Sequence, residues 1–206
     1  MIPLRVRSMV PPLISAILAS AITWFICRGR EKGEPSPGYL HRDTPEQWLL
    51  EPGTTIDDVF MGDTAPWILE APDTITLHER FRGKQDPNLH LLHGSHAFRK
   101  EGVEPPADLR QPLLHIVGSV STYRNPSACL FEPLVLIRFS REGRHLDTLW
   151  CFSCKDMRAW TVVDGKAGER GGAGISHEGK TAIISCLSRA LPSNAELKNL
   201  SGIHRP

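Results

Sequence analysis

The chain has 206 residues and nearly balanced charge, with 24 basic and 23 acidic residues and a formal net charge of +1. No basic patch with interleaved aromatic residues is present, so the sequence gives no support to nucleic-acid binding. Its five cysteines are too few for a small, disulfide-dense scaffold. Beyond a leader and a linker, enough residues remain for one domain with a sizeable core.

An apolar run without any charged residue covers residues 10–27 and follows a basic N-terminal tail, residues 1–9. A helix needs about 17–25 such residues to cross a bilayer. We therefore expect a single transmembrane helix that acts as a signal anchor, with the membrane itself as the partner. Two alternatives stay open. Cleavage after the small residues 19–21 would make the run a signal peptide, and acylation of Cys27 would make the chain a lipoprotein.

Residues 28–38 are charged and rich in Pro and Gly, and we interpret them as a linker. Basic groups are equal in number on the two sides of the apolar run once the α-amino group is included. Charge therefore does not settle the membrane orientation. Beyond the linker we expect a single folded domain over residues 39–206.

The first half of this domain is expected to combine short helices, strands and a long loop. Thr44 and Pro45 are the residue types that begin helices. Alternating apolar residues favour a strand over residues 74–81. The other expected elements are a short helix over 64–71, a loop over most of 82–111 and a buried strand over 113–120.

The clearest local signal is a β-hairpin formed by two apolar runs, residues 130–140 and 145–153, on either side of Arg-Glu-Gly-Arg. With Glu142 and Gly143 at the centre of the turn, position i faces position 285 − i. The elements expected after it are a strand over 158–163, a flexible glycine-rich loop over 168–174 and a helix with one apolar face over 180–191. The predicted fold class is α+β, an antiparallel β-sheet with a covering C-terminal helix, preceded by the transmembrane helix.

Three cysteines, Cys129, Cys151 and Cys154, are the candidates for chemistry, and the last two form a Cys-Phe-Ser-Cys motif. Residues three apart in an extended strand point to opposite faces. Cys151 and Cys154 can therefore share a metal or a disulfide only if the strand turns between them. The hairpin register places Cys129 opposite Asp156 and diagonally next to Cys154. Structural thiols, a disulfide, and a metal or redox site with these three cysteines as ligands all stay open.

The remaining candidates for a catalytic or metal site have simpler interpretations. His90, His93 and His96 are regularly spaced, but Gly94 interrupts them and no carboxylate lies at a useful spacing, so we interpret them as loop histidines without a metal. No nucleophile elbow surrounds a serine, and the glycines of 171–174 do not have phosphate-binding spacing. We therefore expect no cofactor, and we favour a non-enzymatic role.

The cysteine-containing strands resemble a family of uncharacterised bacterial exported proteins and lipoproteins. The residues that carry the resemblance are Cys129-Leu-Phe-Glu-Pro133, Ile137-Arg138 and Leu149-Trp-Cys-Phe-Ser-Cys154, with residues 71–77 and 116–119 similar to the upstream strands. Leu130 is an extra residue relative to the family's Cys-Phe-x-Pro strand. The resemblance covers about residues 65–192. It implies export and an α+β fold, but no reaction.

These observations predict a membrane-tethered bacterial envelope domain of unknown activity, single-pass, with the folded part on the outer side of the membrane. Its role is expected to be binding or structural. The alternative is a thiol or zinc protein that uses Cys129, Cys151 and Cys154.

Overall fold

The computed structural model describes residues 49–84, 86, 89–127 and 130–202. The predicted transmembrane run 10–27, the linker 28–38, the helix start at Thr44 and Pro45, and Cys129 lie outside these residues and stay predictions. Within the described residues, no helix is both long enough and apolar enough to cross a membrane.

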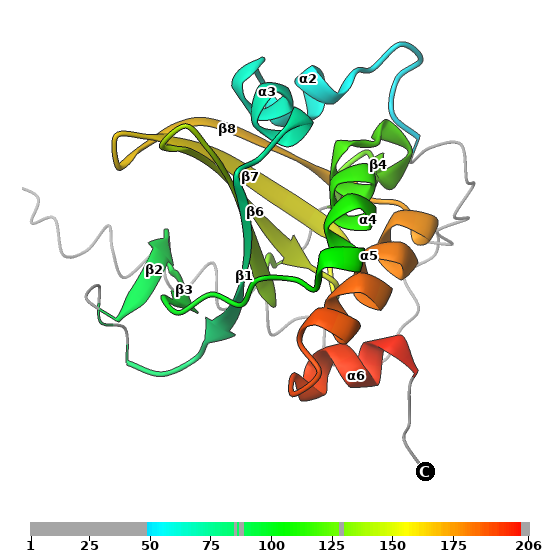
Figure 1. Ribbon diagram of the computed structural model, residues 1–206. Helices are drawn as coiled ribbons and strands as arrows, with labels where there is room; N and C mark the ends of the chain where they lie inside the picture. The colour runs from blue at the N-terminus through cyan, green and yellow to red at the C-terminus, as the bar shows by residue number, and fades with distance from the viewer. Residues whose placement is uncertain (1–48, 85, 87–88, 128–129, 203–206) are drawn as a thin grey trace, which may run out of the picture. The chain divides into compact units, whose positions relative to one another are not determined.

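The described part of the chain contains eight strands in one antiparallel sheet, in the order β2-β3-β1-β5-β6-β7-β8-β4. The strands are β1 (Thr74–Phe81), β2 (His90–His93), β3 (His96–Arg99), β4 (Tyr123–Arg124), β5 (Val135–Arg141), β6 (Arg144–Cys151), β7 (Asp156–Val163) and β8 (Lys166–Ile175). The helices are α2 (Ile56–Phe60), α3 (Thr64–Glu70), α4 (Ala107–Gly118), α5 (His177–Ala190), α6 (Ala195–Ser201) and the 3-10 turn η2 (Val120–Thr122). This arrangement confirms the predicted α+β class and the covering C-terminal helix, α5 (Figure 1).

The hairpin of β5 and β6 has the predicted register, because Arg141 pairs with Arg144 and Val135 with Trp150. Its two turn residues, Glu142 and Gly143, both have positive φ, 49° and 76°. Positive φ at both positions is the geometry that matches the twist of the flanking strands. Asp164 and Gly165 repeat it between β7 and β8, with φ of 51° and 72°.

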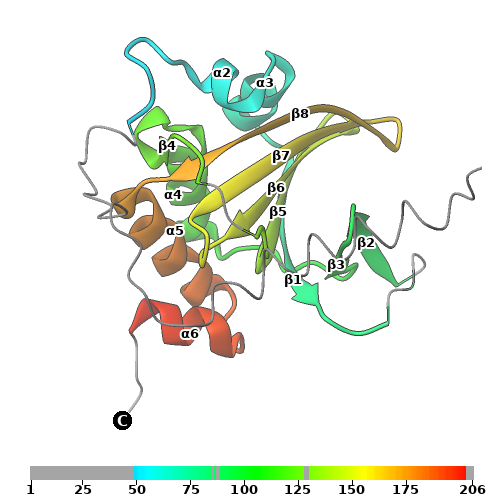
Figure 2. The ribbon, with the colours of Figure 1, turned by 180° about the vertical axis from the view of Figure 1, so that it is seen from behind.

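The main hydrophobic core lies between one face of the sheet and the helices (Figures 1 and 2). Alternate residues of β1 and β5 supply the sheet side, and α4 and α5 supply the helix side through residues one turn apart. Ser176 begins α5, since its hydroxyl accepts a hydrogen bond of 3.0 Å from the Gly179 N–H. Fully buried members of this core are Ile75, Leu77, Ile137, Phe139, Leu113, Val117, Ile183 and Leu187.

The opposite face of the sheet, here called the hairpin face, is covered in part by the β2–β3 hairpin. Phe98 of β3 is fully buried there with Leu136 and Leu149, which belong to β5 and β6. Figure 2 shows this hairpin on the other side of β1, β5 and β6 from α4 and α5. The second, smaller core also includes Phe131, Cys151 and Cys154.

Two predictions in the middle of the chain are wrong. The expected loop over 82–111 contains β2, β3 and the start of α4, and the expected strand over 113–120 lies mostly within α4. The β-branched residues there suggested a strand. The segment is helical instead, because its buried residues recur with the period of an α-helix. Leu109, Leu113 and Val117 lie on one face of α4 and are all buried.

The expected flexible loop over 168–174 is also wrong, since these residues belong to β8. Glycine disfavours strands, but here the neighbours leave no room for a side chain. A Cβ on Gly171 would lie 2.6 Å from the Val59 carbonyl oxygen of α2. A Cβ on Gly174 would lie 2.3 Å from the Asn125 carbonyl oxygen. These glycines are therefore close-packing positions.

Candidate functional site

The Cys-Phe-Ser-Cys motif forms the turn between β6 and β7. β6 ends at Cys151 and β7 begins at Asp156, so the chain turns between the two cysteines. Cys151 and Cys154 are joined by a disulfide, with their Cα atoms 5.7 Å apart. Of the three alternatives that the sequence left open for this pair, the structure has the disulfide. We call residues 151–155 the disulfide turn.

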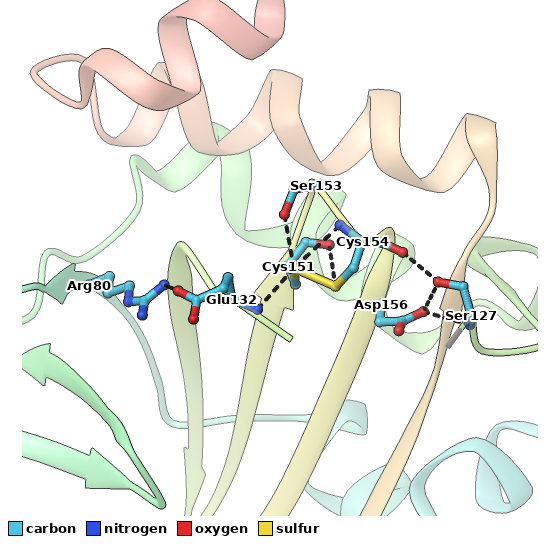
Figure 3. The surroundings of a disulfide bond; sticks show 7 residues. All are labelled: Arg80, Ser127, Glu132, Cys151, Ser153, Cys154 and Asp156. Atoms are coloured by element: carbon cyan, nitrogen blue, oxygen red, sulfur yellow. Dashed lines mark hydrogen bonds and ion pairs between the residues drawn. A yellow bond between two sulfur atoms is a disulfide. The ribbon is translucent and has the colours of Figure 1, made fainter. Parts of the chain in front are cut away.

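Both cysteines of the disulfide turn are buried, and hydrogen bonds to the Cys151 sulfur hold the turn in place. The N–H groups of Glu132 and Cys154 donate to Cys151 Sγ over 3.3 Å and 3.4 Å. The Glu132 carboxylate forms an ion pair with Arg80, and their hydrogen bond lowers the pKa of that carboxyl. Figure 3 shows these contacts extending from β1 through Glu132 to the disulfide.

Ser127 holds the other side of the disulfide turn (Figure 3). Its hydroxyl donates to the Cys154 carbonyl oxygen over 2.7 Å and to Asp156 Oδ1 over 3.2 Å. Its N–H also donates to Asp156 Oδ1, over 3.1 Å. Cys129 lies outside the described residues, but Ser127 and Glu132, on either side of it in the sequence, both contact the disulfide turn. The predicted partnership of Cys129 with this motif stays a prediction.

A pocket of about 430 Å³ lies beside the disulfide turn, over β7 and β8. Two arginines in it lie over aromatic rings. The Arg158 guanidinium carbon is 4.1 Å from the centre of the Phe131 ring, and that of Arg170 is 5.4 Å from the Trp160 ring. Its lining residues are Pro126, Ser127, Asp156, Met157, Arg158, Arg170, Gly171, Gly172 and Ala173. We call this the arginine pocket.

Strand register explains how these groups come together. Arg158 pairs with Gly172, and Trp160 pairs with Arg170, so both arginines extend from neighbouring positions of two antiparallel strands. Asp156 is two residues before Arg158 and therefore lies on the same face. The arginine pocket thus combines two guanidinium groups with one carboxylate.

A second polar group on the hairpin face is an ionic cluster of His93, Arg138 and Asp147. Arg138 Nε and Nη2 each donate over 2.7 Å to a different oxygen of Asp147. His93 Nε2 lies 2.8 Å from Asp147 Oδ2. Burial alone would raise the pKa of Asp147, but the hydrogen bonds from Arg138 and His93 outweigh it and lower the pKa to about 2.

This cluster links the β2–β3 hairpin to β6. The expected loop position of the three histidines is wrong, because His90 and His93 belong to β2 and His96 belongs to β3. His90 stacks on Phe81 with ring centres 4.0 Å apart, and His96 lies edge-on to Phe131. Across the described ranges, no three His, Cys, Asp or Glu side chains are grouped to hold a metal.

Sequence reasoning missed Arg138 and Asp147, although the hairpin register contained the signal. The rule that i faces 285 − i places Arg138 opposite Asp147, and the structure has this pair. Two opposite charges at facing positions within otherwise apolar strands indicate a buried ion pair. Arg158 and Arg170 had no such signal, because β8 was not expected to be a strand.

Comparisons with protein-family models, with curated proteins and with solved structures found no match for this chain.

Proposed function

We propose that the chain is a single-pass bacterial envelope protein. In this proposal, residues 10–27 anchor it in the membrane and residues 39–206 form a binding domain on the outer side. The observation that carries the proposal is the Cys151–Cys154 disulfide. Disulfides persist in the periplasm and outside the cell, and they are rare in the reducing cytosol. The uncharged apolar run 10–27 with basic flanks supports delivery to that compartment.

A binding role is supported by the arginine pocket. Its volume of about 430 Å³ lies in the range of small-ligand sites, about 300–1,000 Å³. Arg158 and Arg170 present directional donors there, and Asp156 presents an acceptor. The ionic cluster supports a structural role instead, because both oxygens of Asp147 are already engaged by Arg138 and His93.

The second candidate is a thiol or zinc protein that uses Cys129, Cys151 and Cys154. The contacts that favour it are those of Ser127 and Glu132, which flank Cys129 in the sequence and touch the disulfide turn. Metal binding by Cys151 and Cys154 would first require reduction of their disulfide, since only the thiolate is a metal ligand.

The deciding experiment is a topology test with alkaline phosphatase and a fluorescent protein fused in turn to the C-terminus. Phosphatase activity without fluorescence supports the proposal, and fluorescence without phosphatase activity overturns it. Mass spectrometry of the purified chain separates the anchor from the alternatives. An intact N-terminus supports the anchor, a chain that begins at Ile22 indicates a cleaved signal peptide, and a lipid on Cys27 indicates a lipoprotein.

The second candidate is tested on the same purified protein by thiol labelling and zinc analysis. One zinc per chain after reduction, lost in a Cys154→Ser variant, would favour it. Unreactive Cys151 and Cys154 without bound metal would end it.

A further inference from the structure

We propose that the arginine pocket binds a small zwitterion, an amino acid or a short peptide. Arg158 and Arg170 would hold its carboxylate, and Asp156 would hold its amino group. This inference rests on the binding role proposed above and names the class of ligand. It is carried by the placement of two guanidinium groups and a carboxylate around one pocket of about 430 Å³.

The two arginines form the anionic end of the proposed site. Each guanidinium lies over a ring, Arg158 over Phe131 and Arg170 over Trp160. Attraction to the ring face restrains the position of each guanidinium, and the N–H donors of a guanidinium lie in its own plane. Paired N–H donors match the two oxygens of a carboxylate, which gives this end its preference for a planar anion.

The space for the ligand comes from glycine. Gly172 pairs with Arg158 and is exposed, so no side chain of β8 fills the position opposite Arg158. A Cβ there would also lie 2.8 Å from the Met157 carbonyl oxygen. Backbone therefore forms the floor of the pocket between the two arginines, as expected where a ligand approaches closely.

Asp156 forms the cationic end. Its Oδ1 accepts two hydrogen bonds from Ser127, which hold the carboxylate at the wall of the pocket. An ionised carboxylate has about four lone-pair sites, so two hydrogen bonds leave capacity for an ammonium group. Asp156 and Arg158 are two strand positions apart, about 7 Å. An extended dipeptide spans about the same distance.

The test uses the full chain in detergent, with glycylglycine as the zwitterionic probe and acetate as an anion that lacks an amino group. Isothermal titration calorimetry is expected to show one glycylglycine per chain and weaker binding of acetate. Arg158→Gln and Arg170→Gln should each lower the affinity for glycylglycine by about tenfold or more, because each removes a charge-assisted hydrogen bond. Asp156→Asn keeps an oxygen that can accept from Ser127, and it should remove most of the difference in affinity between glycylglycine and acetate.

Arg144→Gln is the matched control. Arg144 is exposed and lies over the Trp67 ring at 5.5 Å, much as Arg170 lies over Trp160 at 5.4 Å, but it is outside the pocket. This variant should bind glycylglycine as the unchanged chain does. Equal weakening in Arg144→Gln and Arg170→Gln would overturn the inference, as would no binding of either probe at millimolar concentration.

An amide-shift experiment needs no variant and covers the case in which one fails to fold. In the unchanged, ¹⁵N-labelled chain, glycylglycine should shift the amide signals of Gly171 and Gly172, and an unaffected pair would contradict the site. Failure of this inference and failure of the proposed function are distinguishable. A chain that binds glycylglycine but lies in the cytoplasm refutes only the location, and one that lies outside but binds neither probe refutes only the ligand.

Discussion

The two faces of the sheet are built from alternate residues of the same strands, yet they differ in chemistry. In β5, Val135, Ile137 and Phe139 face the helices, whereas Leu136 and Arg138 face the β2–β3 hairpin. The helix-covered face is almost wholly apolar, and the hairpin face holds the ionic cluster, the disulfide turn and the arginine pocket. The difference suggests that one face stabilises the fold while the other carries specific polar contacts.

The largest effect should come from the helix-covered face. Phe139→Ala should lower the free energy of unfolding by about 3–5 kcal/mol, because it opens a cavity in the main core. Its neighbour Ser140 points to the hairpin face and shares a hydrogen bond of 2.9 Å with His145. Ser140→Ala should cost about 1 kcal/mol. Urea denaturation measures both, and equal losses would contradict the contrast between the faces.

The ionic cluster should be the most sensitive part of the hairpin face. Asp147→Asn leaves Arg138 without its counter-ion, and loss of one partner from a fully buried pair costs about 3–5 kcal/mol. We expect a smaller loss, because the Arg138 side chain keeps 21% exposure. A double variant, Arg138→Met with Asp147→Leu, should recover much of the loss in urea denaturation. No recovery would show that the pair itself supplies net stability.

The disulfide should contribute about 2 kcal/mol, the chain-entropy estimate for a four-residue loop. The paired variant Cys151→Ser with Cys154→Ser should lose this amount relative to the oxidised chain. Added reductant should destabilise the unchanged chain by a similar amount and leave the paired variant unaffected. If reductant destabilises both proteins equally, the effect does not come from this disulfide.

The smallest effect should be a pH dependence that originates on the hairpin face. Burial lowers the pKa of His78, His96 and His145, and repulsion by nearby arginines adds to it. Their pKa is about 6.5 in an unfolded chain. As the pH falls through that range the unfolded state binds more protons, so the free energy of unfolding should decrease.

Denaturation at pH 8, 6 and 5 measures this dependence. His78→Gln should flatten the pH dependence, because it removes one of these three titrating histidines. The neutral His78 ring shares hydrogen bonds with the Thr76 hydroxyl and the Arg99 carbonyl oxygen. If this substitution leaves the pH dependence of the free energy of unfolding unchanged, the effect originates in other groups.

Sequence patterns predicted the elements whose cause is local. The alternation of apolar residues gave β1 its bounds, Thr74–Phe81, and the Glu142–Gly143 turn set the register of β5 and β6. The apolar stripe of the last long helix identified α5. In each case the deciding residues lie within a few positions of one another, so periodicity and turn chemistry suffice.

The candidate site could be predicted only in part. The cysteine pair and its need for a turn were visible, and the register contained the Arg138–Asp147 pair. The arginine pocket was not visible, because Arg170 lies in a glycine-rich segment that becomes a strand only through α2 and β7.

By itself, the sequence determined the α+β class, the central hairpin and the covering helix, since these follow from residue periodicity. Tertiary structure decided the rest. It turned residues 113–118 into helix by giving them an apolar surface to pack against. It made residues 166–175 a strand by pairing them with β7, where neighbouring backbone approaches Gly171 and Gly174 too closely for a side chain. It also brought Ser127, Asp156 and the two arginines around one pocket, through contacts between segments distant in the chain.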